Sequence, residues 1–144
     1  MKRVLLFAGA LILSASLFAQ KKAEDVVKFK ETAHDFGKIK QGTPVTYNFE
    51  FTNTSDGPVV IESASPSCGC TTPVKPEGAI AKGKDDKIIA GFNAAAPGPF
   101  NKTIAIKVAG IDLPVTLRIT GMVLSADDYA KFQSGQGGAK PGSR

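Results

Sequence analysis

The stretch Val45-Thr46-Tyr47-Asn48-Phe49-Glu50-Phe51-Thr52 determines the fold class of this chain. Apolar and polar residues alternate along it without a break. Successive side chains of a strand point to opposite faces, so this period of two indicates a strand with one buried and one solvated face. Pro44 precedes the stretch, and a run of turn-forming residues at 53–58 closes it. Such a strand is typical of an antiparallel sheet.

Short apolar segments of the same kind occur on both sides of this strand. We expect further strands at residues 26–30, 59–62, 87–93, 102–109 and 113–120, with a brief extended piece between glycine turns at 33–42. The last two strands flank a tight turn at 110–112 and so form a hairpin, and Pro114 belongs at a strand start or a sheet edge because it lacks an N–H. About seven short strands over residues 26–124 predict an all-β fold, an immunoglobulin-like β-sandwich, with a small barrel as the nearest competitor.

The two ends of the chain differ in composition from this central domain. Residues 1–19 combine the positive charges of Lys2 and Arg3 with an apolar run and then a segment rich in small residues, which predicts a signal peptide cleaved after Ala19. The apolar run is too short to span a bilayer, so we expect an exported mature form, periplasmic or extracellular, with no membrane span. A polar lead-in follows at 20–25. After the domain we expect a short capped helical turn at 125–132 and a disordered tail to residue 144.

Charge and cysteine content narrow the classes of function. Without Lys2 and Arg3 the chain has 16 basic and 13 acidic residues, scattered singly, so nucleic-acid binding has little support. The two cysteines, Cys68 and Cys70, are separated by Gly69 within the turn-rich run 65–73. In an oxidising compartment such a pair is more often bridged than free.

Three interpretations of Cys68-Gly69-Cys70 follow from the spacing. The first is a local disulfide, for which Gly69 supplies backbone freedom and which adds little global stability because it closes a tiny loop. The second is a thiolate pair for Cu or Zn, with His34 as a third candidate ligand. The third is a redox-active dithiol, although the spacing is not Cys-x-x-Cys. The bridged interpretation is favoured, and the other two stay open.

His34, the single histidine, lies beside Asp35 in the run His34-Asp35-Phe36-Gly37. A histidine in that setting is most often a structural hydrogen-bonding residue, although Asp35 is placed to orient its imidazole. A Cys–His nucleophile pair requires His34 within hydrogen-bond reach of a thiol. The sequence contains no Gly-x-Ser-x-Gly motif, phosphate loop or calcium loop, so we expect no catalytic residues and no enzyme.

Three motifs together give the chain a family resemblance. They are His34-Asp35-Phe36-Gly37-Lys38-Ile39, then Tyr47-x-Phe49-x-Phe51-x-Asn53, then Cys68-Gly69-Cys70-Thr71. Over residues 29–123 the chain resembles the exported bacterial family called domain of unknown function 1573 (DUF1573). The resemblance implies an immunoglobulin-like sandwich and export. It implies no activity, so His34, Asp35, Phe36, Gly37, Cys68, Gly69 and Cys70 are motif positions of unknown role.

We therefore expect an exported, non-catalytic binding or assembly module. Its partner would be a protein or a glycan, and an edge strand of the sandwich offers one physical mode of binding. The alternative is a metal-binding (Cu or Zn) or thiol-redox protein that uses Cys68 and Cys70, with His34 as a further ligand.

Overall fold

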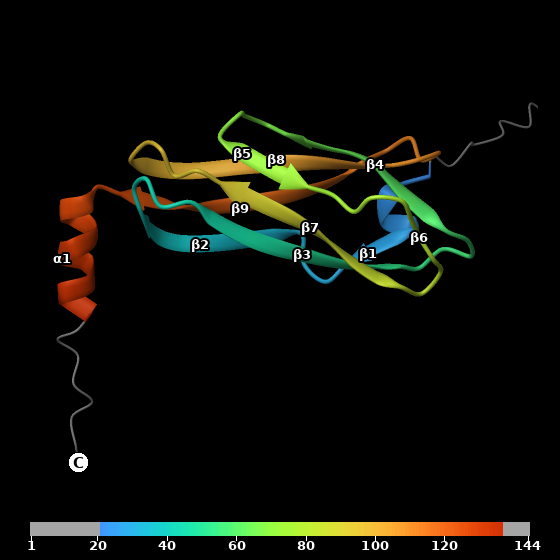
Figure 1. Ribbon diagram of the computed structural model, residues 1–144, viewed down its shortest axis with the longest axis horizontal. Helices are drawn as coiled ribbons and strands as arrows, with labels where there is room; N and C mark the ends of the chain where they lie inside the picture. The colour runs from blue at the N-terminus through green and yellow to red at the C-terminus, as the bar shows by residue number, and fades with distance from the viewer. Residues whose placement is uncertain (1–20, 137–144) are drawn as a thin grey trace, which may run out of the picture.

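Residues 21–136 are described by a computed structural model, in which two β-sheets pack face to face (Figure 1). One sheet has the order β1 (Val27–Phe29), β3 (Val45–Asn53), β7 (Asp85–Phe92), β5 (Thr71–Val74). The other has the order β2 (Ala33–Lys40), β9 (Val115–Leu124), β8 (Gly98–Val108), β4 (Val59–Pro66), β6 (Ala79–Ile80). The predicted all-β, immunoglobulin-like sandwich is confirmed. Short strands such as β5 and β6, which sequence periodicity does not reveal, bring the number of strands above seven.

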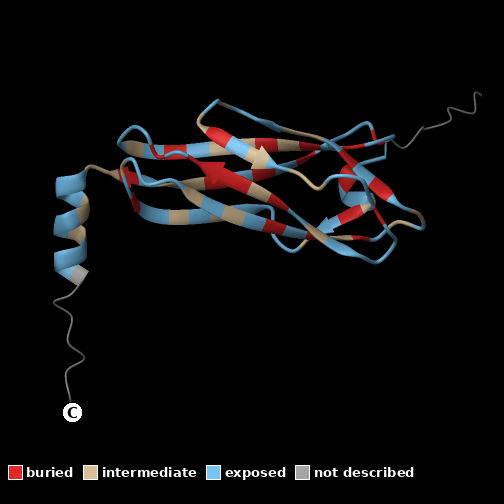
Figure 2. Ribbon diagram, viewed as in Figure 1, coloured by how far each residue is buried: buried red, intermediate tan, exposed pale blue. Residues whose placement is uncertain are grey.

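The core lies between the two sheets and follows the predicted alternation. On β3, Phe49 and Phe51 are buried, whereas Asn48 and Glu50, which alternate with them, face solvent. Figure 2 shows this alternation of buried and exposed positions along the strands. Fully buried partners come from four other strands: Ile61, Ile88, Ala90, Ile104, Ile106, Leu117 and Ile119. Burial of these apolar side chains is the main favourable contribution to folding.

Asn53, a polar residue, is also fully buried, and its hydrogen bonds explain its place in the second motif. Its amide nitrogen donates to the carbonyl oxygens of Gly57 (2.8 Å) and Ile80 (2.9 Å). Its side-chain oxygen accepts from the backbone N–H of Ser55 (2.9 Å). A buried amide with all these partners fixes the turn after β3 instead of costing free energy.

The predicted hairpin near the C-terminal end of the domain is present as β8 and β9. The strands pair antiparallel from Gly98–Val123 to Ile106–Val115. Pro114 lies immediately before β9, where no ladder hydrogen bond is needed from it. β8 begins at Gly98 rather than at 102, because Gly98, Pro99 and Phe100 already pair with Val123, Met122 and Gly121 of β9.

The segment at 33–42 departs most from the sequence prediction. It forms β2, an eight-residue edge strand that pairs in parallel with β9. The register shifts between Asp35 and Lys38, and Gly37 has φ 64°. Gly37 therefore produces a bulge within a strand rather than a turn that ends one, since its missing Cβ permits left-handed backbone.

Two helical segments flank the sheets. The 3-10 helix η1 (Ala23–Asp25) precedes β1, and α1 (Ala126–Gln136) follows β9. α1 is longer than the predicted turn at 125–132, and its last residues were expected in the disordered tail. Its first turn is capped by Ser125, whose hydroxyl accepts from the backbone N–H of Asp128 (3.2 Å). No helix within 21–136 has the length and apolar character to cross a bilayer. The predicted signal peptide at 1–19 and residues 137–144 lie outside the described part.

Candidate functional site

The His34-Asp35-Phe36-Gly37 motif builds the bulge of β2. The carboxylate of Asp35 accepts a hydrogen bond from the backbone N–H of Gly37 (2.9 Å). This local bond holds the left-handed backbone of Gly37, in the manner of an Asx turn. Asp35 thus has a structural role here.

Aromatic side chains connect this bulge to the cysteine loop. The ring of Phe36 lies 6.4 Å from that of Phe100 on β8, measured between centroids. Phe100 stacks on Phe92 of β7 at 4.1 Å. Phe92 pairs with Thr71 at the start of β5, directly after Cys70. The first and third sequence motifs are therefore joined through Phe92 and Phe100, two residues that belong to neither motif.

Gly121 on β9 makes the close packing of these rings possible. It lies opposite Phe100 in the β8–β9 ladder. A Cβ atom at Gly121 would come within 2.7 Å of two Phe100 ring atoms and 2.9 Å of the Gly37 carbonyl oxygen. The ring of Phe100 and the bulge thus both occupy the space that a side chain would need.

His34 lies on the other side of Phe36, in a stack with Tyr47 of β3. The two rings are 3.5 Å apart between centroids and nearly parallel, at 9°. The hydroxyl of Tyr47 donates to the carboxylate of Glu31 (2.6 Å). This hydrogen bond, together with partial burial and the negative charges of Glu31 and Glu50, raises the pKa of Tyr47.

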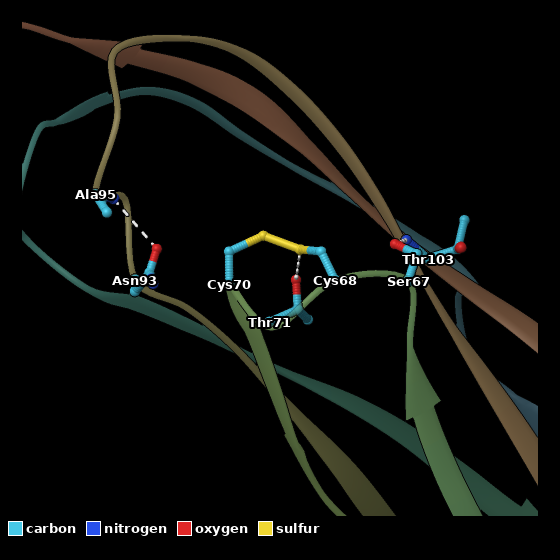
Figure 3. Close-up of a disulfide and its surroundings, with 7 residues drawn as sticks. All are labelled: Ser67, Cys68, Cys70, Thr71, Asn93, Ala95 and Thr103. Carbon is cyan, nitrogen blue, oxygen red and sulfur yellow. Dashed lines mark hydrogen bonds between the residues drawn. A yellow bond between two sulfur atoms is a disulfide. The ribbon is translucent and has the colours of Figure 1, made fainter.

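The cysteine loop connects β4 in one sheet to β5 in the other. Cys68 and Cys70 form a disulfide, with their Cα atoms 5.3 Å apart (Figure 3). The Thr71 hydroxyl lies 3.7 Å from the Cys68 sulfur. Since a disulfide sulfur has no proton to give, the hydroxyl is the donor in that contact. Both cysteines are half-buried, whereas Gly69 is exposed.

Backbone hydrogen bonds hold the loop on both sides of the bridge. Ser67 and Thr103 exchange two bonds, from the Ser67 N–H to the Thr103 carbonyl (2.8 Å) and from the Thr103 N–H to the Ser67 hydroxyl (3.1 Å). On the other side the Asn93 N–H donates to the Cys70 carbonyl (3.1 Å). The loop is therefore positioned by β8 and by the β7–β8 connection, independently of the sulfur atoms.

The β7–β8 connection at 93–97 has an uncommon backbone. Ala94 is fully buried and has φ 51°, a left-handed conformation that costs a residue with a Cβ about 1–2 kcal/mol. Two bonds from the β2–β3 turn hold it, from the Gly42 N–H to the Ala94 carbonyl (2.9 Å) and from the Gln41 side chain to the Ala95 carbonyl (3.0 Å). Strain that the surrounding structure maintains is common at functional sites.

Between the cysteine loop and this connection lies a pocket of about 220 Å³. Cys70 and Phe92 lie on one side of it, and Phe100 and Lys102 of β8 line it as well. The remaining lining comes from Asn93, Ala95, Ala96, Pro97, Gly98 and Pro99. We call it the disulfide pocket. Most of its lining residues are apolar, polar atoms form a large share of its exposed surface, and Lys102 is its one charged residue within the described range.

The structure does not bring His34 together with the cysteines. β2, which carries His34, is the first edge strand of its sheet, and His34 stacks on Tyr47 of β3 in the facing sheet. Cys70 directly precedes β5, which lies at the far edge of that facing sheet, beyond β3 and β7. In residues 21–136 no three His, Cys, Asp or Glu side chains are grouped as a metal site would need. Over the same residues His34 makes no hydrogen bond to either sulfur, so the Cys–His nucleophile pair is not formed.

Sequence reasoning missed Phe92, Phe100 and Gly121 as parts of this site. Phe92 lies in the predicted strand 87–93 with no feature that marks a site, and Phe100 lies beside two prolines outside any predicted strand. The available signal for Gly121 was an isolated glycine inside a strand pattern, which marks a close approach of other atoms.

Comparison with known families and structures gives one family match. The model described as "Protein of unknown function (DUF1573)" matches residues 27–123. No curated protein matches the chain.

Solved structures share the fold at low identity. A protein of unknown function from Porphyromonas gingivalis W83 is 15% identical, with a TM-score of 0.57 over 68% of this chain and 46% of that one. The chain thus spans less than half the length of that protein. PapD-like domain 7 of human CEP192 is 11% identical, with a TM-score of 0.58 over 70% of this chain and 87% of the domain. The SrpA adhesin of Streptococcus sanguinis is 10% identical, with a TM-score of 0.51 over 72% of this chain and 61% of the adhesin.

Proposed function

Because the chain belongs to the DUF1573 family, whose function is unknown, we propose a role from its own geometry: an exported, non-catalytic binding module that receives a protein partner at the disulfide pocket. The observation that carries the proposal is the pocket itself. Its walls are two loops fixed by hydrogen bonds, and the aromatic stack of Phe92 and Phe100 lies beneath them. A preformed recess lined mostly by apolar residues suits an anchoring side chain of a partner.

The motifs support the same location. The Asp35–Gly37 bulge, Phe36 and the cysteine loop all contribute to the packing that shapes this end of the sandwich. The β2–β3 turn also supports it, through its bonds to the strained connection at Ala94. Residues far apart in the sequence thus maintain one surface feature.

Strand addition at a sheet edge has less support than binding at the pocket. The edge strands β1 and β6 have three and two residues. β5 has four residues, including Pro73, which lacks an N–H. β2 is longer, but its bulge interrupts the edge. Short, bulged or proline-containing edges are the usual protection against strand pairing.

A protein partner fits this pocket better than a glycan does. Apolar residues, prolines included, make up most of its lining, and charged groups are depleted at the centre of protein interfaces. A glycan would offer hydroxyl groups for which the pocket has few hydrogen-bonding side chains.

Site-specific photo-crosslinking in the producing cell tests the proposal. A photoreactive amino acid replaces Ala96, which is exposed and lines the pocket, and in a second strain it replaces Ala81, which is exposed on a distant loop. We expect a discrete protein adduct from position 96 and none from position 81. Equal adduct patterns at the two positions, or an adduct that is a polysaccharide, would contradict binding of a protein at the pocket.

Export is the second part of the proposal, and it depends on the composition of residues 1–19. Intact-mass measurement of protein recovered from the cell envelope or the medium is expected to show a chain that begins at Gln20. Recovery of the full-length chain from the cytoplasm alone would contradict it.

A further inference from the structure

We propose that the Cys68–Cys70 disulfide exchanges with a dithiol of an exported protein partner, which it oxidises while that partner is seated in the disulfide pocket. This inference rests on the proposed binding at the pocket and adds the chemical class of the partner: a protein segment with two nearby thiols.

The Cys68–Cys70 disulfide contributes little to the stability of the fold. It joins residues only two apart, and the stabilisation from restricting the unfolded chain falls as the closed loop shortens. The loop is already positioned by the Ser67–Thr103 bonds and by the bond from Asn93 to Cys70. A disulfide that is not needed to hold its loop is free to open and close without unfolding the domain.

The two sulfurs have different surroundings, and the difference gives exchange a direction. Cys70 lines the pocket, so a partner side chain held there meets this residue. Cys68 has the Thr71 hydroxyl 3.7 Å from its sulfur, with the hydroxyl as donor. A hydrogen bond to a departing thiolate makes it a better leaving group. We therefore assign Cys70 as the sulfur under attack and Cys68 as the leaving group.

The charge at the pocket favours the same reaction. Among residues 21–136, Lys102 is the single charged residue of the pocket lining and no carboxylate lines the pocket. Exchange requires the thiolate form of the attacking cysteine. A lone ammonium group at the site attracts that anion, while the apolar surface holds the side chains that flank it.

The exchange conserves atoms and electrons. A partner thiolate attacks the Cys70 sulfur, an intermolecular disulfide forms, and the Cys68–Cys70 bond breaks with its electron pair on Cys68. The second partner thiolate then attacks the partner's own sulfur in that mixed disulfide and releases Cys70 as a thiolate. The two protons from the partner's thiols end on Cys68 and Cys70. The partner leaves with a disulfide, and two electrons have moved to this chain.

A time course of thiol–disulfide exchange, quenched at intervals and measured by intact mass, tests this proposal. The purified oxidised protein is mixed with a reduced synthetic peptide that has Cys-x-x-Cys flanked by leucine, and the reaction is quenched with an alkylating agent. We expect the peptide to be oxidised to its disulfide as the protein is reduced, so that after quenching the protein carries two alkyl groups and the oxidised peptide none. This oxidation is expected to be at least about tenfold faster than that of a peptide in which aspartate replaces the leucine.

Two pairs of variants assign the roles. Thr71→Val keeps the shape of the buried residue but removes the hydroxyl, and we expect it to slow exchange about tenfold, the usual scale of a hydrogen bond to an anion. Thr72→Val, at the neighbouring exposed position, is expected to leave the rate unchanged. Lys102→Gln is expected to slow exchange several-fold in low salt. Lys107→Gln, five residues along the same strand and outside the pocket, serves as its control.

Three outcomes would overturn the inference. They are a disulfide that the dithiol peptide does not reduce, equal rates for the two peptides, and equal rates for Thr71→Val and Thr72→Val. A leucine peptide with alanine in place of both cysteines can bind but cannot exchange. It therefore separates a failure of exchange from a failure of the proposed binding. If that peptide binds and Ala96→Asp abolishes the binding, the pocket is a binding site even where exchange fails. If neither binding nor exchange occurs, the exchange proposal and the binding proposal on which it rests both fail.

Discussion

At the scale of single residues, Gly121 is the glycine of the described range that leaves the least room for a methyl group. Its Cβ would lie 2.7 Å from Phe100 and 2.9 Å from the Gly37 carbonyl. Since both the ring and the bulge would have to shift, we expect Gly121→Ala to lower the free energy of unfolding by about 1–3 kcal/mol, measured in urea. Gly57→Ala is the matched control, because a Cβ there meets no atom within 4 Å. Equal losses for the two variants would show that Gly121 has no special packing role.

The hydrogen bond from Tyr47 to Glu31 predicts a pH dependence. It raises the pKa of Tyr47, so folding favours the protonated phenol. The resulting stabilisation is complete below the ordinary tyrosine value of about 10 and is lost as the pH rises through the folded value. In a Tyr129→Phe background, where Tyr47 is the remaining tyrosine, we expect Glu31→Gln to lower the titration midpoint of Tyr47 absorbance. An unchanged midpoint would mean that Glu31 does not hold the hydroxyl.

At the scale of elements, α1 is capped at its N-terminus and lies outside the hydrophobic core. Ser125 caps it, and Lys38 of β2 lies 4.5 Å from the centre of the Phe132 ring. We expect Ser125→Ala to weaken the helix by about 1 kcal/mol and to speed amide exchange at 126–132. The unfolding midpoint of the sandwich is expected to stay constant because no core residue of the sheets belongs to α1. Ser134→Ala, near the other end of the helix, is the control. A lower midpoint in Ser125→Ala would show that the helix is part of the cooperative core.

Elements with a complete apolar alternation were predictable from the sequence. β3, β7, β8 and β9 follow the period of two, because each has one face on a single core. β2 was not predictable as a full strand. Its parallel pairing with β9 depends on residues about 85 positions away, and Gly37 has the local appearance of a turn. β5 and β6 are too short to show a period at all.

At the scale of the whole molecule, the fold is expected to survive loss of the disulfide. With the small loop that it closes, the bridge contributes under about 2 kcal/mol in the chain-entropy model. We expect the reduced protein, and the Cys68→Ala/Cys70→Ala double variant, to unfold cooperatively and to keep dispersed amide resonances. Loss of cooperative unfolding on reduction would contradict both the supporting role of the Ser67–Thr103 bonds and the exchange proposal.

The candidate site was only partly predictable because its parts meet across the sandwich. The cysteine pair and the His34–Gly37 run stand out in the sequence by residue type, and their motifs pointed to the family. Nothing in their spacing shows that Phe92 and Phe100 connect Phe36 to Cys70, since these contacts arise from packing among β2, β8 and β7. The same packing places His34 on Tyr47 instead of near the thiols, which spacing along the chain does not reveal either.

Binding of a protein partner in the disulfide pocket can be measured directly as an affinity, with the partner that is captured from position 96. Titration by calorimetry compares the unmodified protein with Ala96→Asp, which puts a carboxylate on the apolar wall, and with Ala81→Asp, the same change at a distant exposed site. We expect Ala96→Asp to weaken binding by about tenfold or more, because the partner would have to strip water from the new carboxylate when it covers the pocket, and we expect Ala81→Asp to leave the Kd unchanged. Equal affinities for the two variants would contradict binding at the pocket.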